Sequence, residues 1–287
     1  GGLELGMDKK EALEIVQEYP FELKYLPTHF RKDKEINLAA VKRKGSALQF
    51  ADKSFRKDKD VVLEAVKEDS YALEFVDESL KKDKKFILQM IKLYGTSVFT
   101  YAVKPLTKNK KFILELIKLY PHRDDLDILL SFADNILMKD KKFILKILKK
   151  TLPRGYVLQF ADNSLKKNKK FIIEAVKQDF FALGFADNSL KKDKEIVLEA
   201  VKQDYMALED ADSSLIKNKK FMLELIKLHP RREYEDLNNI LTYVSDSLKK
   251  DKKFIIEVIK QDFFTLEDID ESLRNDLDIL AIINKKK

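Results

Sequence analysis

The chain has 287 residues, of which 45% are hydrophobic and 37% are charged, and its formal net charge is +7. The absence of cysteine excludes a disulfide framework, a thiolate nucleophile and a cysteine-ligated metal. No apolar run approaches the roughly 18 residues of a membrane-spanning helix. The start of the chain lacks the basic-then-apolar pattern of a signal peptide. We therefore expect a cytoplasmic protein or one delivered into a host cell.

One stretch recurs along almost the whole chain, and its clearest copy is NKKFIIEAVKQDFFALGFADNSLKK at 168–192. Each copy opens with Asp or Asn, and the openers are spaced by 25 to 33 residues. A period in this range is typical of stacked helical repeats. The openers define repeats 1 to 11 in chain order: Asp8, Asp33, Asp58, Asp83, Asn109, Asp140, Asn168, Asp193, Asn218, Asp251 and Asp276.

Within a repeat, the opener is a good helix N-cap. Apolar residues three, four, seven and eight positions later form a helical stripe. In repeat 7 this pattern predicts a first helix of about ten residues, a break at 178–179 and a shorter second helix over 180–186. Asp187 and Ser189 then have the spacing of a turn cap. One such hairpin cannot bury both apolar faces alone, so we expect an all-α fold in which the repeats stack as an α-solenoid.

The predicted solenoid has ten full units and a truncated C-terminal one, and forms a single elongated domain over 1–287. Its parts are an N-terminal cap region, the repeats, and a C-terminal cap with a tail: 1–32, 33–275 and 276–287. Two insertions near 119–128 and 228–238 lie between the helices of repeats 5 and 9. Insertions at matching points emerge on one face of a solenoid, which is often the binding face.

The repeat is most regular in DKDVVLEAVKEDSYALEFVDESL (58–80) and DKEIVLEAVKQDYMALEDADSSL (193–215). These segments resemble an uncharacterised family of tandem short helical repeats, a domain of unknown function with units of the form D-K-x-V-V-L-x-A-V. The resemblance covers nearly the entire chain. It implies no activity, and it implies recognition surfaces of the kind found in bacteria, protists and large viruses.

Lysines flank most openers, and stacked loops would align them along one edge. A lysine in the first turn opposes the helix dipole, so local helix stability does not explain the pattern. One interpretation is a polyanion-binding ridge; the other is a solvated edge that neighbouring acids neutralise. Arginine is scarce and no stacking aromatics interleave with the lysines, which weakens nucleic-acid binding. The candidate polyanion-binding residues are Lys82, Lys84, Lys108, Lys110, Lys139, Lys141, Lys167, Lys169, Lys192 and Lys194.

Acidic residues also recur, near the end of each second helix. A turn cap explains them better than paired catalytic carboxylates, because an active site is normally singular. His29, His122 and His229 lack a second histidine at helical metal-ligand spacing. No G-x-S-x-G, P-loop or dinucleotide glycine pattern occurs. We therefore expect no enzyme, no cofactor and no metal. The recurring aspartates are Asp52, Asp77, Asp134, Asp162, Asp187, Asp212, Asp246 and Asp270.

Aromatic residues follow two patterns. Phenylalanines three positions after the opener are predicted to lie in the core, whereas the tyrosines beside the insertions are either interface anchors or half-buried packing residues. We expect a non-enzymatic scaffold that binds another protein, as an interaction module, inhibitor or effector. Nucleic acid is the alternative partner, and no membrane is involved. The candidate protein-binding residues are Tyr120, His122, Arg123, Arg231, Arg232 and Tyr234.

Overall fold

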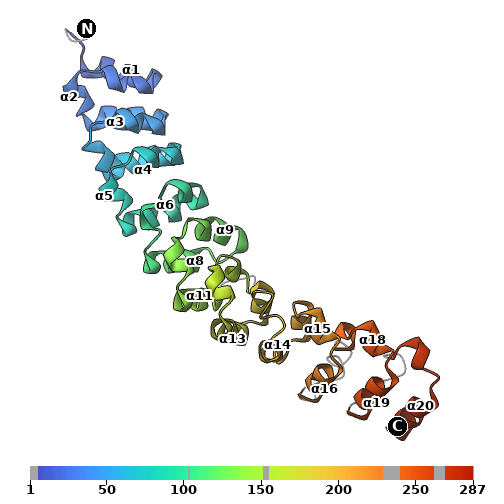
Figure 1. The fold of residues 1–287 in the computed structure, drawn as a ribbon. Coiled ribbons are helices and arrows are strands. Elements are labelled where there is room, and N and C mark those ends of the chain that lie inside the picture. The colour runs from blue at the N-terminus through green and yellow to red at the C-terminus, as the bar shows by residue number, and fades with distance from the viewer. Residues whose placement is uncertain (1–5, 103, 151–154, 229–239, 262–268, 287) are drawn as a thin grey trace. The chain divides into compact units, whose positions relative to one another are not determined.

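The computed structural model describes residues 6–102, 104–150, 155–228, 240–261 and 269–286 (Figure 1). Over these residues every regular element is a helix and no strand occurs. The chain forms two compact units, Gly1–Asp134 and Asn135–Lys287, and each is described by itself. Throughout the described ranges, no helix is both long enough and apolar enough to cross a lipid bilayer.

The N-terminal unit alternates α-helices with short 3-10 helices. Its elements are α1 (Lys9–Glu18), η1 (Pro20–Tyr25), α2 (Thr28–Arg31), α3 (Lys34–Arg43), η2 (Gly45–Phe50), η3 (Phe55–Lys57), α4 (Lys59–Glu68), η4 (Ser70–Phe75), α5 (Glu78–Lys81), α6 (Lys84–Tyr94), η5 (Gly95–Val98), α7 (Phe99–Ala102), η6 (Lys104–Leu106), α8 (Lys110–Leu119) and α9 (Arg123–Phe132).

The C-terminal unit repeats this alternation. Its elements are α10 (Asn135–Met138), α11 (Lys141–Leu148), η7 (Tyr156–Gln159), α12 (Asn163–Lys166), α13 (Lys169–Gln178), η8 (Phe180–Phe185), α14 (Lys194–Val201), η9 (Tyr205–Glu209), α15 (Ser213–Ile216), α16 (Lys219–Leu228), α18 (Asp246–Lys249), α19 (Lys252–Gln261), η11 (Glu271–Leu273) and α20 (Leu277–Lys286).

The long helices begin where the openers predict. In all eleven repeats the Oδ1 atom of the opener accepts a backbone N–H from the first helical turn. This bond satisfies one of the donors that a helix N-terminus leaves unpaired. The first helix of repeat 7, α13, accordingly starts at Lys169, one residue after its cap Asn168. The sequence prediction of these N-caps is confirmed.

In repeats 1, 2, 3, 6, 7 and 8 the second helix is a 3-10 helix rather than an α-helix, whereas repeat 5 has the α-helix α9. In repeat 7, Asp179 ends α13 and its side chain accepts the Phe181 N–H at 3.1 Å, which starts η8. Phe180, Leu183 and Ala186 are buried. Their spacing of three residues matches the three residues per turn of a 3-10 helix. Because this stretch is only six residues long and returns to extended backbone at Ala186, it does not settle into α-helical turns.

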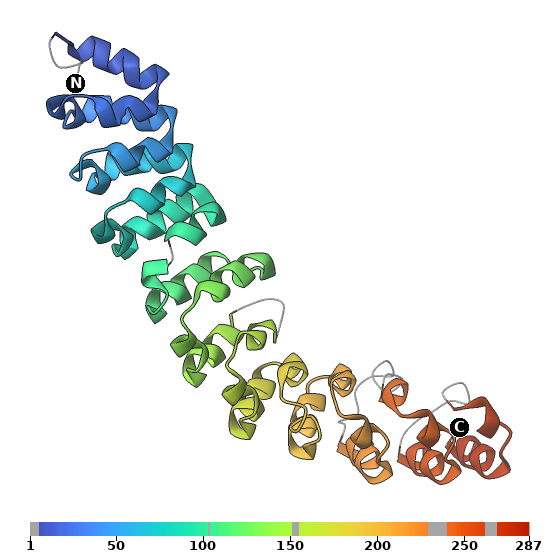
Figure 2. The ribbon, with the colours of Figure 1, turned by 45° about the horizontal axis from the view of Figure 1, so that its top comes forward.

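Within each unit, equivalent helices pack in succession (Figure 2). In the N-terminal unit α1 packs on α3, and α3 packs on α4. The 3-10 helices follow the same order, since η1 packs on η2 and η2 packs on η4. In the C-terminal unit the order is α11, α13, α14, α16, α19 and α20. The predicted phenylalanines fill the space between the helices and are at most 3% exposed: Phe86, Phe112, Phe143, Phe171, Phe221 and Phe254.

Candidate interaction surfaces

The predicted protein-binding residues are only partly described. Tyr120 is the C-cap of α8, and the exposed His122 is the N-cap of α9 without a side-chain capping bond. Arg123 is the first residue of α9. Arg231, Arg232 and Tyr234, with most of the second predicted insertion, lie outside the described residues. The predicted surface that combines both insertions therefore stays a prediction.

Tyr120 also packs between repeats. Its hydroxyl donates to the Ile91 carbonyl oxygen at 2.9 Å, and its ring meets Phe99 edge to face at 5.4 Å. Burial raises the pKa of Tyr120. Tyr94 repeats this contact one repeat earlier, since its hydroxyl donates to the Leu63 carbonyl oxygen at 3.2 Å. Part of the Tyr120 side chain is thus used to hold α8 against α6.

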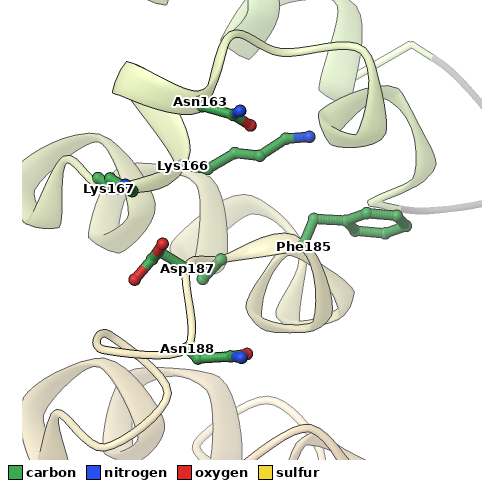
Figure 3. A pocket seen from close by; sticks show the side chains of 7 residues that line it. Asn163, Lys166, Lys167, Phe185, Asp187 and Asn188 are labelled. Carbon is green, nitrogen blue, oxygen red and sulfur yellow. The ribbon is translucent and has the colours of Figure 1, made fainter.

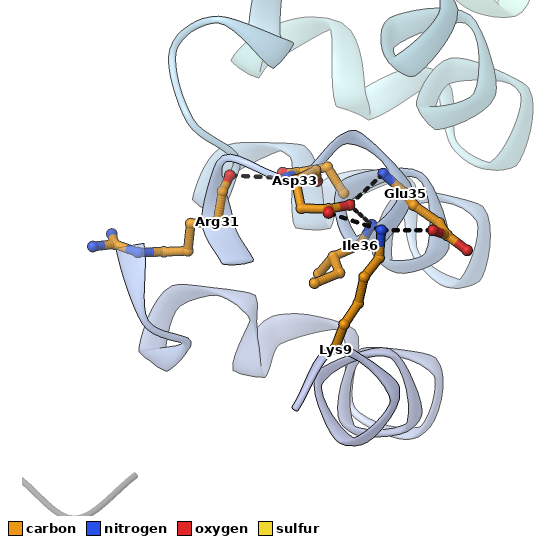
Figure 4. A network of polar contacts seen from close by, with 6 residues as sticks. Lys9, Arg31, Asp33, Glu35 and Ile36 are labelled. Atoms are coloured by element: carbon orange, nitrogen blue, oxygen red, sulfur yellow. Dashed lines mark hydrogen bonds and ion pairs between the residues drawn. The ribbon is translucent and has the colours of Figure 1, made fainter. Parts of the chain in front are cut away.

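At six boundaries in the described part of the chain, the lysine that follows an opener reaches the opener of the next repeat. Figure 4 shows Lys9 extending from the start of α1 to the carboxylates of Asp33 and Glu35. The Lys9 ammonium lies 2.8 Å from Asp33 Oδ2 and 2.7 Å from Glu35 Oε2. Asp33 therefore uses Oδ1 to cap α3 and Oδ2 to bind the preceding repeat.

The same contact recurs in both units, and we call it the inter-repeat ladder. Its pairs are Lys9–Asp33, Lys34–Asp58, Lys59–Asp83, Lys169–Asp193, Lys219–Asp251 and Lys252–Asp276, at 2.7 to 3.1 Å. The Lys9 ammonium holds the pKa of Asp33 below its usual value, and Asp33 followed by Glu35 raises the pKa of Lys9. The Lys9–Asp33 pair thus stabilises both charges across the boundary between repeats 1 and 2.

The lysine that precedes the opener faces the recurring aspartate instead. Lys108, Lys139 and Lys192 lie 3.9 Å from Asp134, Asp162 and Asp212, respectively. The sequence prediction of turn caps is confirmed for six of the recurring aspartates: Asp52, Asp77, Asp162, Asp187, Asp212 and Asp270. It is wrong for Asp246, which is the first residue of α18 and follows the N-cap Ser245. The Asp187 carboxylate accepts the backbone N–H of Ser189 at 3.0 Å and its hydroxyl at 2.6 Å. Those two bonds, followed by the charge of Lys167, lower the pKa of Asp187.

The remaining candidate lysines lie at other places along this edge. Lys110 is the first residue of α8. In the part of the chain that the structure describes, Lys82, Lys84, Lys141 and Lys194 are exposed and have no ion pair. For the last three, the next opener is Asn109, Asn168 or Asn218, which carries no charge. The basic edge predicted from sequence is therefore only partly neutralised by acids of the chain itself, which face Lys108, Lys139, Lys169 and Lys192.

A second surface consists of aromatic rings on or directly after the second helices of the repeats, and we call it the aromatic row. In the N-terminal unit, the ring of Tyr71 meets those of Phe75 and Tyr101 edge to face, at 5.3 and 5.7 Å. Phe21 meets Phe50 in the same way at 5.8 Å. Tyr71 is 45% exposed, so its ring faces solvent while it bridges two repeats.

The C-terminal unit carries its own aromatic row. Tyr156 meets Phe160 and Phe185 edge to face at 6.0 and 6.5 Å. Phe185 also lines a shallow pocket of about 310 Å³ together with Asn163, Lys166, Lys167, Ala186, Asp187 and Asn188. Figure 3 shows Lys166 and Phe185 projecting in the same direction from consecutive repeats, with Asp187 pointing away from them.

Lys166 is a partly buried cation that lines this pocket. Its ammonium donates to the Gln159 carbonyl oxygen at 2.8 Å, and burial lowers its pKa. Lys81 makes the equivalent bond to the Glu74 carbonyl oxygen at 2.9 Å in the N-terminal unit. These lysines therefore brace the end of a 3-10 helix and place their aliphatic stems next to the aromatic row.

Sequence reasoning missed the aromatic row, although a signal for it exists. An aromatic residue stands two positions before the recurring aspartate in repeats 2, 3, 5, 6 and 7: Phe50, Phe75, Phe132, Phe160 and Phe185. Aligning the repeats on that aspartate, instead of on the opener, shows the row. Insertions between the two helices disturb the alignment when the opener is used as the reference.

Metal ligation and a charge-relay site were not predicted. Among the described side chains, no group of three or more histidine, cysteine, aspartate or glutamate residues is arranged to hold a metal ion. The ion pairs and turn caps above use the acidic residues in repeated structural contacts.

A family model described as Domain of unknown function (DUF4116) matches residues 8–56, 58–106, 154–191, 171–216, 193–249 and 218–274. No curated protein and no solved structure matches the chain significantly.

Proposed function

The chain belongs to the Domain of unknown function (DUF4116) family, and from its surfaces we propose that it is a non-enzymatic scaffold that binds another protein. We further propose that the repeats build an α-solenoid of ten full units and a truncated eleventh. The successive packing of α11, α13, α14, α16, α19 and α20 within the C-terminal unit supports this architecture.

The aromatic row is the observation that carries the proposal. Half-exposed rings recur at equivalent positions of consecutive repeats and support one another edge to face. Such contacts hold the rings in place without burying their outer faces. Rigid aromatic side chains are the residues that most often dominate protein–protein binding energy, because they bury a large area at a low entropic cost.

Two further features favour a protein partner. The pocket beside Phe185 offers a recess next to the row in which a partner side chain can be buried. The row also repeats along the chain, which suits recognition of an extended surface better than chemistry at one point.

Nucleic acid is the alternative partner. It would need a basic track that neutralises several phosphates. Of the ten candidate lysines, Lys169 takes part in the inter-repeat ladder, and three more face aspartates of the chain: Lys108, Lys139 and Lys192. The rings of the aromatic row contact one another edge to face, whereas bases stack on the open faces of aromatic platforms. These observations weigh against that alternative.

The experiment is a pulldown from the source lysate with and without nuclease, at low and high salt. Two variants test the row. Tyr71→Ser with Tyr101→Ser removes two of its rings, and Phe181→Ser with Phe185→Ser removes one of its rings together with a 36% exposed neighbour on η8. The control, Leu93→Ser with Leu119→Ser, removes apolar side chains that are 58% and 40% exposed outside the row. We expect a discrete protein that resists nuclease and high salt, and whose affinity falls about tenfold or more in a row variant.

Binding that the control reduces as much as the row variants do would contradict the proposal. Recovery of nucleic acid alone, lost at high salt, would instead support the polyanion alternative. Circular dichroism of each variant checks that its helices are intact.

A further inference from the structure

The pocket beside Phe185, between repeats 6 and 7, is lined by a cation with unused hydrogen-bonding capacity. The partly buried Lys166 donates from its ammonium group to the Gln159 carbonyl oxygen at 2.8 Å. Within the residues that the structure describes, Lys166 has no ion pair. An ammonium group has three donors, so two of them remain for a ligand in the pocket.

Two other repeats place a carboxylate next to the lysine at this position. In repeat 3 the Lys81 ammonium lies 3.3 Å from Glu78 Oε1, three residues earlier in α5. In repeat 9 the Lys249 ammonium lies 3.9 Å from Asp246 Oδ1, three residues earlier in α18. The equivalent residue of repeat 6 is Asn163. An uncharged amide thus replaces the carboxylate at the pocket.

The boundary between repeats 7 and 8 supplies a carboxylate from the other side. There Lys191 is equivalent to Lys166, and Asp210 is equivalent to Phe185. The Asp210 carboxylate lies close over Gly184, because a Cβ atom added to that glycine would be 2.9 Å from it. Burial raises the pKa of Asp210, and the charge of Lys191 opposes this rise. At the pocket, a neutral ring replaces this second carboxylate as well.

The charges that line the pocket match a single anionic side chain. Lys166 and Lys167 contribute two positive charges and Asp187 one negative charge, which leaves a net charge of +1. The Asp187 carboxylate points away from Lys166 in Figure 3 and accepts two hydrogen bonds from Ser189. Phe185 projects in the same direction as Lys166. A side chain with an aliphatic stem can therefore pack on the ring while its charge meets the ammonium group.

We propose that the pocket formed by Asn163, Lys166, Lys167 and Phe185 binds a glutamate side chain of a protein partner. The carboxylate of that glutamate takes the place beside Lys166 that Glu78 fills beside the equivalent lysine of repeat 3. A singly charged carboxylate suits the net charge of the lining better than a phosphate group, which carries close to two negative charges. This inference rests on the proposed function, and it names the side chain that the partner presents beside the aromatic row.

The test uses the full chain and a fluorescent peptide of alternating glutamate and serine with an amidated C-terminus. A glutamine counterpart is the uncharged probe, and fluorescence anisotropy at low salt measures affinity. Asn163→Glu copies Glu78 of repeat 3 and gives Lys166 a partner within the chain. We expect this variant to bind the glutamate peptide about tenfold more weakly than the unmodified chain. Asn163→Gln lengthens the side chain without the charge and should keep the affinity.

Asn135→Glu is the matched control for net charge. Asn135 is exposed and begins α10 as Asn163 begins α12, but the residue three positions later is Met138 instead of a lysine. Both glutamate variants change the net charge equally, and we expect the control to keep most of the affinity. Carbodiimide coupling followed by mass spectrometry should join the peptide to Lys166 in the unmodified chain and in the control, and much less in Asn163→Glu.

Equal affinity for the two peptides, or equal loss of affinity in Asn163→Glu and Asn135→Glu, would overturn the site. Weaker binding of a single-stranded oligonucleotide, but not of the peptide, in Asn163→Glu would assign the pocket to nucleic acid and overturn the proposal. In the pulldown, a partner lost in Tyr71→Ser with Tyr101→Ser and retained by Asn163→Glu would uphold the proposed function and overturn this inference alone. A partner that the tyrosine variant leaves unaffected would count against the aromatic row and leave the peptide result untouched.

Discussion

The Lys169 ammonium lies 2.7 Å from the Oδ2 atom of Asp193, which caps the first helix of the next repeat with its other oxygen. Asp193 thus caps a helix of its own repeat and forms an ion pair with a lysine of the preceding repeat. Both partners remain partly exposed, at 44% for Lys169 and 24% for Asp193. Each such pair is therefore expected to contribute modestly, and the ladder acts through its repetition.

The ladder predicts a specific acid sensitivity. Lys9, Lys59 and Lys252 lower the pKa values of Asp33, Asp83 and Asp276 below the ordinary 3.8. A carboxyl whose folded pKa is lowered adds stability above its unfolded pKa, and that stability is lost as pH falls through the folded value. The melting temperature should therefore drop as the pH falls below about 3.8.

Thermal denaturation between neutral and strongly acidic pH measures this drop. Lys252→Met, which removes the partner of Asp276 and Asp278, should flatten the acid dependence. An unchanged profile in this variant would mean that the pair does not couple protonation to folding.

An asparagine opener can be converted into a ladder pair. Lys84 is exposed, and the opener of the next repeat is the uncharged Asn109, whereas Lys59 in the preceding repeat pairs with Asp83 at 3.0 Å. Asn109→Asp should keep the N-cap and add an ion pair, which raises stability by about 0.2–1 kcal/mol at low salt. Urea unfolding at low and high salt measures the gain, which salt should remove. A gain that persists in the double variant with Lys84→Met would refute this explanation.

The core phenylalanines should be much more sensitive than the exposed ones. Phe171 is 1% exposed between repeats, and Phe171→Ala should destabilise the chain by about 3–5 kcal/mol because it leaves a cavity. Phe181 is 36% exposed, and Phe181→Ala should cost about 1 kcal/mol. Denaturant unfolding followed by circular dichroism compares them. Similar losses at the two positions would contradict the assignment of Phe171 to the core.

Gly45 marks a close approach between repeats. A Cβ atom added there would lie 2.2 Å from the Ala65 carbonyl oxygen, a backbone atom that cannot move alone. Gly45→Ala should therefore cost about 1–3 kcal/mol. Gly184→Ala is the matched control, since its Cβ would meet the Asp210 carboxylate at 2.9 Å and that side chain can rotate away. Thermal melts of the two variants should differ clearly, and equal melting temperatures would rule out the proposed backbone clash.

The helix starts and the core phenylalanines could be predicted because both depend on local patterns. An opener such as Asn168 needs only the next few residues to act as a cap, and Phe171 follows it at helical spacing. The 3-10 form of 180–185 could not be predicted, because a short apolar run fits several helical periods. The ion-pair partners of Lys9 and Lys34 lie in the next repeat, so no local pattern predicts these contacts. The sequence alone therefore left two interpretations of the lysines, a solvated edge and a polyanion-binding ridge.

The opener of the first repeat has a different partner. Asp8 forms a reciprocal capping box with Glu11, in which each side chain accepts the backbone N–H of the other residue. In repeats 2, 3, 4, 8, 10 and 11 the opening aspartate accepts the lysine of the preceding repeat. A 25-residue segment of this kind can be duplicated or deleted in frame without leaving an unmatched charge. The ladder is thus compatible with gain or loss of whole repeats in the gene. At repeats that open with asparagine, the opener is uncharged and this matching of charges does not apply.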